Sequence, residues 1–251
     1  MHPPRSLWID HLILLSVFFT AAYFLGKCVL KHTWNANNTR KTLGAVMLVA
    51  PWFVGYGAPY AANRVEVVGT YFLFLAALLV FWEPLRKRSR FLQTAFAAID
   101  RPEDRPNTLM WMATSYVVTA AATLLMAWWL LADHRALAIT VLFSIIIGDL
   151  LAGVVGYNFG TRRYQTAGLF TSQQYTRSIE GSACVLLTTL AILFAVRTSM
   201  PPSHFMAAVL LLPITLTLAE AKSPHTWDEP IMTVAGTVIC LAIVIALPRL
   251  V

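Results

Sequence analysis

Charged residues are scarce in this chain. Asp, Glu, Lys and Arg together make up 12% of the 251 residues, whereas soluble domains carry about 25%. Hydrophobic residues make up 58% and gather in runs long enough to form helices that cross a bilayer. The composition excludes an ordinary soluble domain. It predicts an all-α polytopic membrane protein, with a single transmembrane domain over residues 1–251.

The chain also lacks the nucleotide and hydrolase motifs of soluble enzymes. It has no Walker A sequence, no G-x-G-x-x-G, no G-x-S-x-G and no paired His-x-x-x-His. These absences exclude soluble kinase and hydrolase folds. Its three cysteines lie in separate apolar segments without metal-ligand spacing, which is typical of small core residues. We find no internal repeat of the kind that marks transporters with inverted halves.

The apolar runs predict about eight membrane-spanning helices. Their expected bounds are 7–30, 43–61, 65–82, 109–132, 136–157, 181–197, 203–221 and 230–248. The second run holds four helix-breaking residues, so a re-entrant shape is an alternative there. These residues are Pro51, Gly55, Gly57 and Pro59. No cleavage site follows the first run, so we expect a retained first helix.

The net charge of +7 comes mainly from cations in the odd-numbered loops between these runs. Under the positive-inside rule, this predicts cytoplasmic odd loops and termini outside. We therefore expect the cations to serve topology and anionic headgroups, with no nucleic acid partner. Residues 90–99 of the third loop have the spacing of a short amphipathic helix that can lie in the headgroup plane. A topological anchor is the favoured interpretation, and contact with a substrate headgroup is the alternative.

Asp149 is the most unusual residue of the fifth run. We expect it about 13 Å from the cytoplasmic end of its helix, where a carboxylate costs about 2.5–3.5 kcal/mol. Small residues recur every four positions around it, at Gly148, Ala152, Gly156 and Gly160. Two interpretations stay open. The face is a tight helix seam with a protonated Asp149, or Asp149 binds a metal beside a phosphate that approaches the glycine backbone.

A polar loop follows, and the next helix is predicted to begin after Ser178. Ser178 is suited to cap that helix, with Glu180 and Gly181 in its first turn. A helix start beside Arg177 is typical of phosphate sites. Simple capping, with Arg177 serving only topology, explains the same residues equally well.

A second acidic cluster lies between the last two runs. Ser223-Pro224 ends one helix, and Pro230 opens the next. The acidic residues there are Glu220, Asp228 and Glu229. Together with Asp149 and Glu180 they predict carboxylate oxygens on one membrane face, which suit Mg²⁺ bound with nucleotide phosphates. His225 in the same loop is a weaker candidate, because a lone loop histidine is more often incidental.

Three motifs in this order resemble a known family. They are Gly148-Asp149-x-x-Ala152-x-x-Val155-Gly156-x-x-Phe159-Gly160, then Arg177-Ser178-x-Glu180-Gly181, then Glu220-Ala221-x-Ser223-Pro224 with Asp228. Over residues 145–232 the chain resembles the CTP-dependent lipid-alcohol kinases. That family includes dolichol kinase, phytol kinase and CTP-dependent diacylglycerol kinase, and it is related to phosphatidate cytidylyltransferases. Arg40-Lys41 is similar to an earlier basic motif of the family.

The resemblance implies a membrane enzyme that uses CTP and a divalent cation such as Mg²⁺ to phosphorylate a polyprenol, a phytol-like alcohol or diacylglycerol. Arg177 stands where the family usually has Lys, and Glu229 where it usually has Asn. We expect catalytic roles for Asp149, Glu220 and Asp228. Nucleotide contacts are expected at Gly156, Gly160, Arg177, Ser178, Glu180 and Gly181. Metal contacts are expected at Asp149, Glu180, Asp228 and Glu229. The alternatives are cytidylyl transfer that makes a CDP-lipid and, in another class, a transporter or lipid-binding protein.

Overall fold

The computed structural model describes residues 7–54, 64–130, 134–168 and 173–247. These residues form helices apart from one two-stranded hairpin, which confirms the all-α fold class. The chain divides into two compact units, Met1–Thr114 (unit 1) and Ser115–Val251 (unit 2). All of the motifs between residues 145 and 232 belong to unit 2.

Five helices of the described part are long and apolar enough to cross a membrane. They are Trp8–Leu30, Thr108–Met126, Arg135–Phe159, Pro202–Lys222 and Asp228–Ala246. Ile179–Ala195 is apolar but shorter. The finding supports the predicted membrane class. The count of about eight spans stays a prediction.

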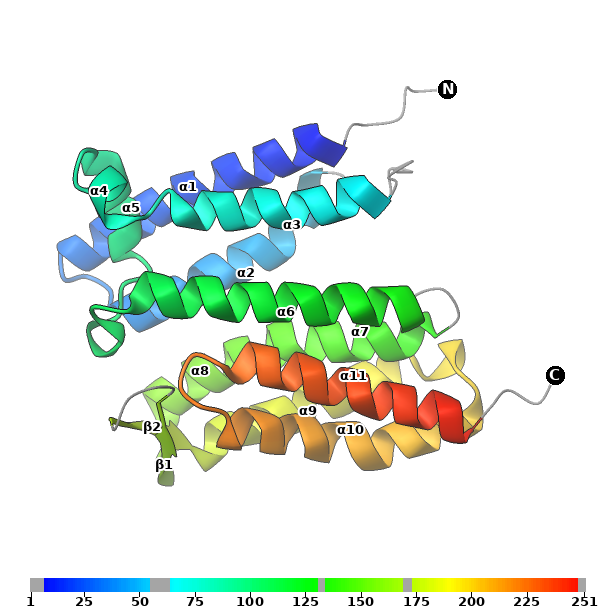
Figure 1. Cartoon of the computed structure of the whole chain (residues 1–251). Helices are drawn as coiled ribbons and strands as arrows, with labels where there is room; N and C mark the ends of the chain where they lie inside the picture. The colour runs from blue at the N-terminus through cyan, green and yellow to red at the C-terminus, as the bar shows by residue number, and fades with distance from the viewer. Residues whose placement is uncertain (1–6, 55–63, 131–133, 169–172, 248–251) are drawn as a thin grey trace. The chain divides into compact units, whose positions relative to one another are not determined.

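Unit 1 contains α1 to α5 and the beginning of α6 (Figure 1). The bounds are α1 Leu7–Leu30, α2 Ala36–Val54, α3 Arg64–Leu79, α4 Glu83–Arg86, α5 Arg90–Ala97, the 3₁₀ turn η1 Pro102–Asp104, and α6 Thr108–Leu130. Helix α2 continues through Pro51 to Val54. Gly55, Gly57 and Pro59 lie outside the described residues, and the re-entrant alternative concerns them.

Helix α5 is the amphipathic segment expected in the third loop. Ser89 caps it by accepting a hydrogen bond from the Leu92 N–H. Its apolar side packs on α1, where Phe96 is 6% exposed. Gly26 permits this approach, because a Cβ there would collide with the Thr94 carbonyl. Protein therefore covers most of the apolar side of α5, and its position in the headgroup plane stays a prediction.

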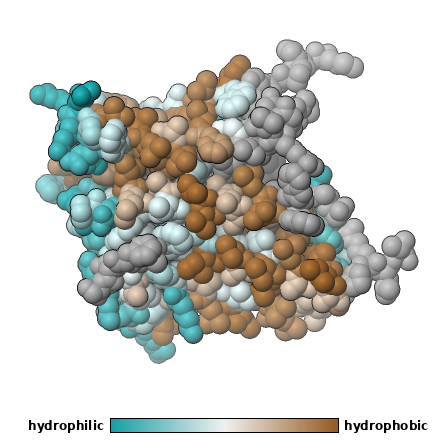
Figure 2. Space-filling model, viewed as in Figure 1, coloured by the Kyte–Doolittle hydropathy of each residue, from teal (hydrophilic) through white to brown (hydrophobic). Residues whose placement is uncertain are grey.

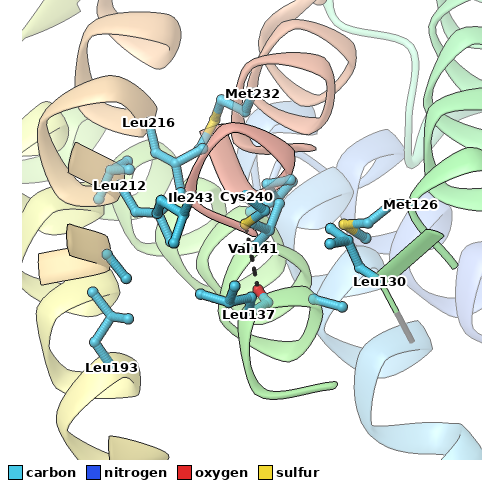
Figure 3. Close-up of a cluster of buried hydrophobic side chains, with 14 of the residues drawn as sticks. Met126, Leu130, Leu137, Val141, Leu193, Leu212, Leu216, Met232, Cys240 and Ile243 are labelled. Carbon is cyan, nitrogen blue, oxygen red and sulfur yellow. Dashed lines mark hydrogen bonds between the residues drawn. The ribbon is translucent and has the colours of Figure 1, made fainter. Parts of the chain in front are cut away.

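Unit 2 contains the rest of α6 and the helices α7 to α11. The bounds are α7 Arg135–Phe143, the π-helix η2 Ser144–Gly148, α8 Asp149–Phe159, α9 Ile179–Ala195, the 3₁₀ turn η3 Arg197–Ser199, α10 Pro202–Lys222 and α11 Asp228–Ala246. Figure 3 shows the core, where Leu137 and Val141 of α7 lie beside Cys240 of α11. The Cys240 thiol is buried, 4.0 Å from the Leu137 carbonyl oxygen, as expected for a small core residue.

The hairpin joins α8 to α9. Strands β1 Arg163–Ala167 and β2 Gln174–Ser178 pair antiparallel, with Tyr164 opposite Arg177. The sequence predicted a polar loop here. The strands receive support from a distant segment, because the His225 N–H donates to the Ala167 carbonyl at 3.0 Å. Figure 2 shows hydrophilic side chains gathered around this end of unit 2, while hydrophobic side chains cover its helices.

Candidate functional site

Arg177, the next-to-last residue of β2, lies at the centre of a polar network at the hairpin end of unit 2. Its Nη1 donates to Glu220 Oε1 at 2.5 Å, and its Nη2 donates to Ser223 Oγ at 3.2 Å. Its Nη2 also lies 3.6 Å from Asp228 Oδ2. These partners come from the end of α10, the following loop and the start of α11. The structure thus joins two of the three sequence motifs, which lie more than 40 residues apart.

The first motif contributes through Asp149. The Asp149 carboxylate is 8% exposed in the first turn of α8, and its charge acts on Arg177. Burial by itself would lower the pKa of Arg177, but the charges of Asp228, Glu220 and Asp149 outweigh burial and raise it. Arg177 is therefore a permanent cation held among three carboxylates. Of the three predicted catalytic residues, Glu220 and Asp228 contact Arg177, and Asp149 acts on it through its charge.

A chain of hydroxyl groups supports the other oxygen of Glu220. Ser182 in α9 donates to Glu220 Oε2 at 2.7 Å. The Tyr164 hydroxyl lies 2.7 Å from the same Ser182 oxygen. Because Ser182 gives its hydrogen to Glu220, it accepts one from Tyr164. Burial raises the pKa of Tyr164, so the phenol keeps the proton that it donates.

These hydroxyl groups were missed from the sequence as parts of the site. Ser182 was not singled out at all, although it follows Gly181 directly. Tyr164 was noted only as a polar loop residue. Their role depends on the strand register of the hairpin and on the packing of α9 against α10. A local sequence pattern predicts neither the strand register nor this helix packing.

The loop between α10 and α11 holds the hairpin by ring stacking as well as by the backbone bond to Ala167. The His225 and Tyr175 rings stack with centroids 3.7 Å apart and planes 5° from parallel. The structure therefore gives His225 a packing role. Its suggested role as ligand or base stays a prediction.

The row of small residues in α8 packs on α9. A Cβ on Gly156 would lie 3.0 Å from Ser178 Oγ, and one on Gly181 would lie 2.8 Å from the Ala152 carbonyl oxygen. A Cβ on Gly160 would also meet Ser178. The helix-seam interpretation thus accounts for the spacing, because α9 occupies this face. Nucleotide contacts at Gly156, Gly160 and Gly181 stay a prediction.

The start of α9 confirms the predicted cap. Ser178 Oγ accepts a hydrogen bond from the Gly181 N–H at 3.1 Å. The Ile179 N–H donates to the Arg162 carbonyl at 2.9 Å. These N–H groups are engaged within the protein, so a phosphate at this helix start would have to replace existing bonds. The geometry therefore favours the capping interpretation of Ser178.

Glu180 has different hydrogen-bond partners from Glu220 and Asp228. It accepts hydrogen bonds from the Thr161 hydroxyl at 2.5 Å and from the Arg162 N–H at 3.1 Å. It therefore fastens the turn between α8 and β1. Glu229 is exposed in the first turn of α11.

Among the described residues, no group of three or more His, Cys, Asp or Glu side chains is placed to hold a metal ion. Mg²⁺ does not require such a group, since nucleotide phosphates and waters supply most of its ligands beside one or two carboxylates. Asp228, with a side chain 19% exposed, and Asp149 fit that smaller requirement. Glu180 is engaged with Thr161 and Arg162, and its metal contact, like that of Glu229, stays a prediction.

Comparisons of the chain with protein-family models, with curated proteins and with solved structures found no match.

Proposed function

We propose that this protein is a membrane enzyme that transfers a phosphoryl group from CTP to the hydroxyl group of a lipid alcohol. The observation that carries the proposal is the contact of Glu220 and Asp228 with Arg177 at one end of unit 2, within reach of the charge of Asp149. Phosphoryl transfer depends mainly on positioning and on neutralising charge. The carboxylates can bind a metal that neutralises phosphate charge, and the fixed cation can position a phosphate. Both lie on helices suited to a bilayer, where a lipid alcohol can reach them.

The charge of the network favours an uncharged acceptor. The nearby carboxylates already engage the Arg177 guanidinium. An acceptor that is itself a phosphate, as cytidylyl transfer requires, would bring further negative charge to this acidic group. A neutral alcohol adds none. We therefore rank lipid phosphorylation above formation of a CDP-lipid.

Each residue of the network has a proposed task. Asp228 and Asp149 would hold Mg²⁺, which neutralises charge on the nucleotide phosphates when bound. Arg177 would contact a phosphate oxygen, because a guanidinium carries more N–H donors than its present contacts use. Glu220, oriented by Ser182 and Arg177, would accept the proton of the lipid hydroxyl.

Product analysis tests the proposal. Purified protein is incubated with Mg²⁺, a panel of polyprenols, phytol and diacylglycerol, and CTP labelled on the γ-phosphate. We expect CDP and a labelled lipid phosphate. Release of pyrophosphate with a CDP-lipid would establish cytidylyl transfer instead. If no lipid on the panel leads to CTP consumption, the enzyme proposal fails and a transporter or lipid-binding protein takes its place.

We also propose that the hairpin end of unit 2 faces the cytoplasm and that both termini lie outside. The basis is the excess of Lys and Arg in the odd-numbered loops. Single cysteines placed at Arg88, which is exposed in the third loop, and at the C-terminal residue Val251, in a background without native cysteines, should react with an impermeant thiol reagent from opposite sides. Reaction from the same side would overturn the orientation.

A further inference from the structure

The loop between α10 and α11 contains two buried polar atoms that the proposed mechanism does not use. They are Thr226 Oγ1 and Trp227 Nε1, and neither has a hydrogen-bond partner within the described residues. Thr226 is only 7% exposed. Buried hydroxyl and indole N–H groups nearly always have partners, because losing water without replacement costs free energy. Two such groups in consecutive residues indicate a binding position for a further molecule.

The backbone at the same place is strained. Thr226 has φ of 69°, in the left-handed region that β-branched residues rarely adopt. The neighbours hold it there. The Trp227 N–H donates to the Pro224 carbonyl at 3.0 Å, and His225 is fixed to the hairpin by its backbone bond and its ring. Such strain persists only where surrounding contacts determine the conformation.

The chemistry of the two groups defines the ligand atom. An indole N–H only donates, and a threonine hydroxyl donates as well as accepts. Each of the two groups suits an oxygen acceptor. The next residue, Asp228, begins α11, and its carboxylate lies 3.6 Å from the Arg177 guanidinium of β2, so a cation lies near the end of this loop. A helix start and a guanidinium both favour a negatively charged oxygen.

We infer that Thr226 and Trp227 form a binding position for a phosphate oxygen, with the strained Thr226 backbone holding the hydroxyl in place. The identification of that phosphate as part of CTP rests on the proposed function. The binding position itself rests on the two buried donors and applies to any compound with a phosphate group.

Removal of the hydroxyl at constant shape tests the inference. Affinities for CTP, pyrophosphate and inorganic phosphate are measured with Mg²⁺ on full-length protein in detergent, together with the melting temperature. We expect Thr226→Val to weaken binding about three- to ten-fold, without a fall in melting temperature, because an unpartnered polar atom has gone. Thr226→Ser should restore affinity. Thr237→Val on α11, whose hydroxyl bonds to the Thr233 carbonyl, is the matched control and should bind normally.

Relief of strain supplies a second, independent measurement. Thr226→Gly permits the positive φ and should raise the melting temperature by about 2–4 °C while weakening binding as Thr226→Val does. Trp227→Phe should also weaken binding, because it removes only the indole donor. Higher stability with unchanged affinity in Thr226→Gly would overturn the inference.

The possible outcomes separate the inference from the function. If wild-type protein binds CTP and Thr226→Val binds it equally, the inference fails and the proposed function survives. If wild type binds pyrophosphate or phosphate through Thr226 but shows no preference for CTP, the inference holds and the nucleotide is wrong. If wild type binds none of these compounds, both fail. A lower melting temperature of Thr226→Val with unchanged affinity would show that the hydroxyl serves only a buried water, which also overturns the inference.

Discussion

The two units each contain an ion network with a buried carboxylate, and the two networks are arranged differently. In unit 1, Asp104 is 1% exposed, and Arg40 and Arg101 contact its Oδ2 at 2.9 and 2.8 Å. In unit 2, one arginine is surrounded instead. Arg177 has Glu220 and Asp228 as ion-pair partners. Two cations share one carboxylate in the first network, whereas carboxylates share one cation in the second.

This difference separates a structural network from a candidate for chemistry. Long arginine side chains reach solvent easily, and Arg40 is 22% exposed. Two arginines can therefore share the Asp104 carboxylate at little cost in free energy. This network fastens the first turns of α2 to the η1 turn. Arg40, which belongs to the basic motif Arg40-Lys41, therefore has its ion-pair partner within unit 1. Carboxylates are shorter, and Glu220 and Asp149 are buried. An excess of carboxylates over cations in this network favours the binding of a further cation.

The largest expected effect comes from removing the shared carboxylate of unit 1. Asp104→Ala leaves two guanidinium groups without it and should lower the free energy of unfolding by about 3–5 kcal/mol. Denaturation in detergent measures this loss. Glu103→Ala is the matched control, because Glu103 is 38% exposed and 3.9 Å from Arg101, and its cost should stay below about 1 kcal/mol. Equal costs for the two variants would contradict a structural role specific to Asp104.

The next effect concerns turnover. Asp149→Asn keeps size and hydrogen bonding but removes the charge proposed for the metal and phosphate site. CTP turnover should fall at least about a hundred-fold, or about 2.7 kcal/mol, with the melting temperature unchanged or raised. Asp10→Asn is the control, since Asp10 is a buried aspartate of α1 in unit 1, and should keep full turnover. A stable and fully active Asp149→Asn enzyme would remove Asp149 from the site.

A smaller effect is expected from Arg177→Lys. An ammonium group keeps the charge but cannot contact Glu220, Ser223 and a phosphate at once as a planar guanidinium can. We expect CTP affinity to fall about ten-fold, with a modest loss of stability. Arg162→Lys, at an exposed position before β1, should match wild type. Unchanged affinity in a folded Arg177→Lys protein would limit Arg177 to holding the carboxylates in place.

The smallest effect sharpens the comparison by showing what an exposed pair contributes. Lys87 and Glu83 of unit 1 lie 2.6 Å apart, but their side chains are 72% and 60% exposed. Glu83→Gln should leave the midpoint of denaturation in detergent nearly unchanged, and salt should reduce any remaining difference. A cost as large as that of Asp104→Ala would mean that burial does not distinguish the networks.

The sequence was sufficient for the elements whose cause is local. The apolar run at 7–30 coincides with α1, because apolar length alone favours such a helix in lipid. Ser178 caps α9 as predicted, because a cap needs only a hydroxyl at the right position in the chain. Ser223-Pro224 ends α10 for the same kind of reason.

The tertiary structure decided everything that depends on distant residues. The spacing of small residues indicated a close approach to α8, but only packing showed that α9 makes it. The polar segment between α8 and α9 forms two paired strands, and His225, far along the chain, bonds to the Ala167 carbonyl of β1. Arg177 and the carboxylates were each visible in the sequence, but which charges share a partner follows from the fold. A local pattern records what a residue can bond to, whereas the choice among partners is made by packing.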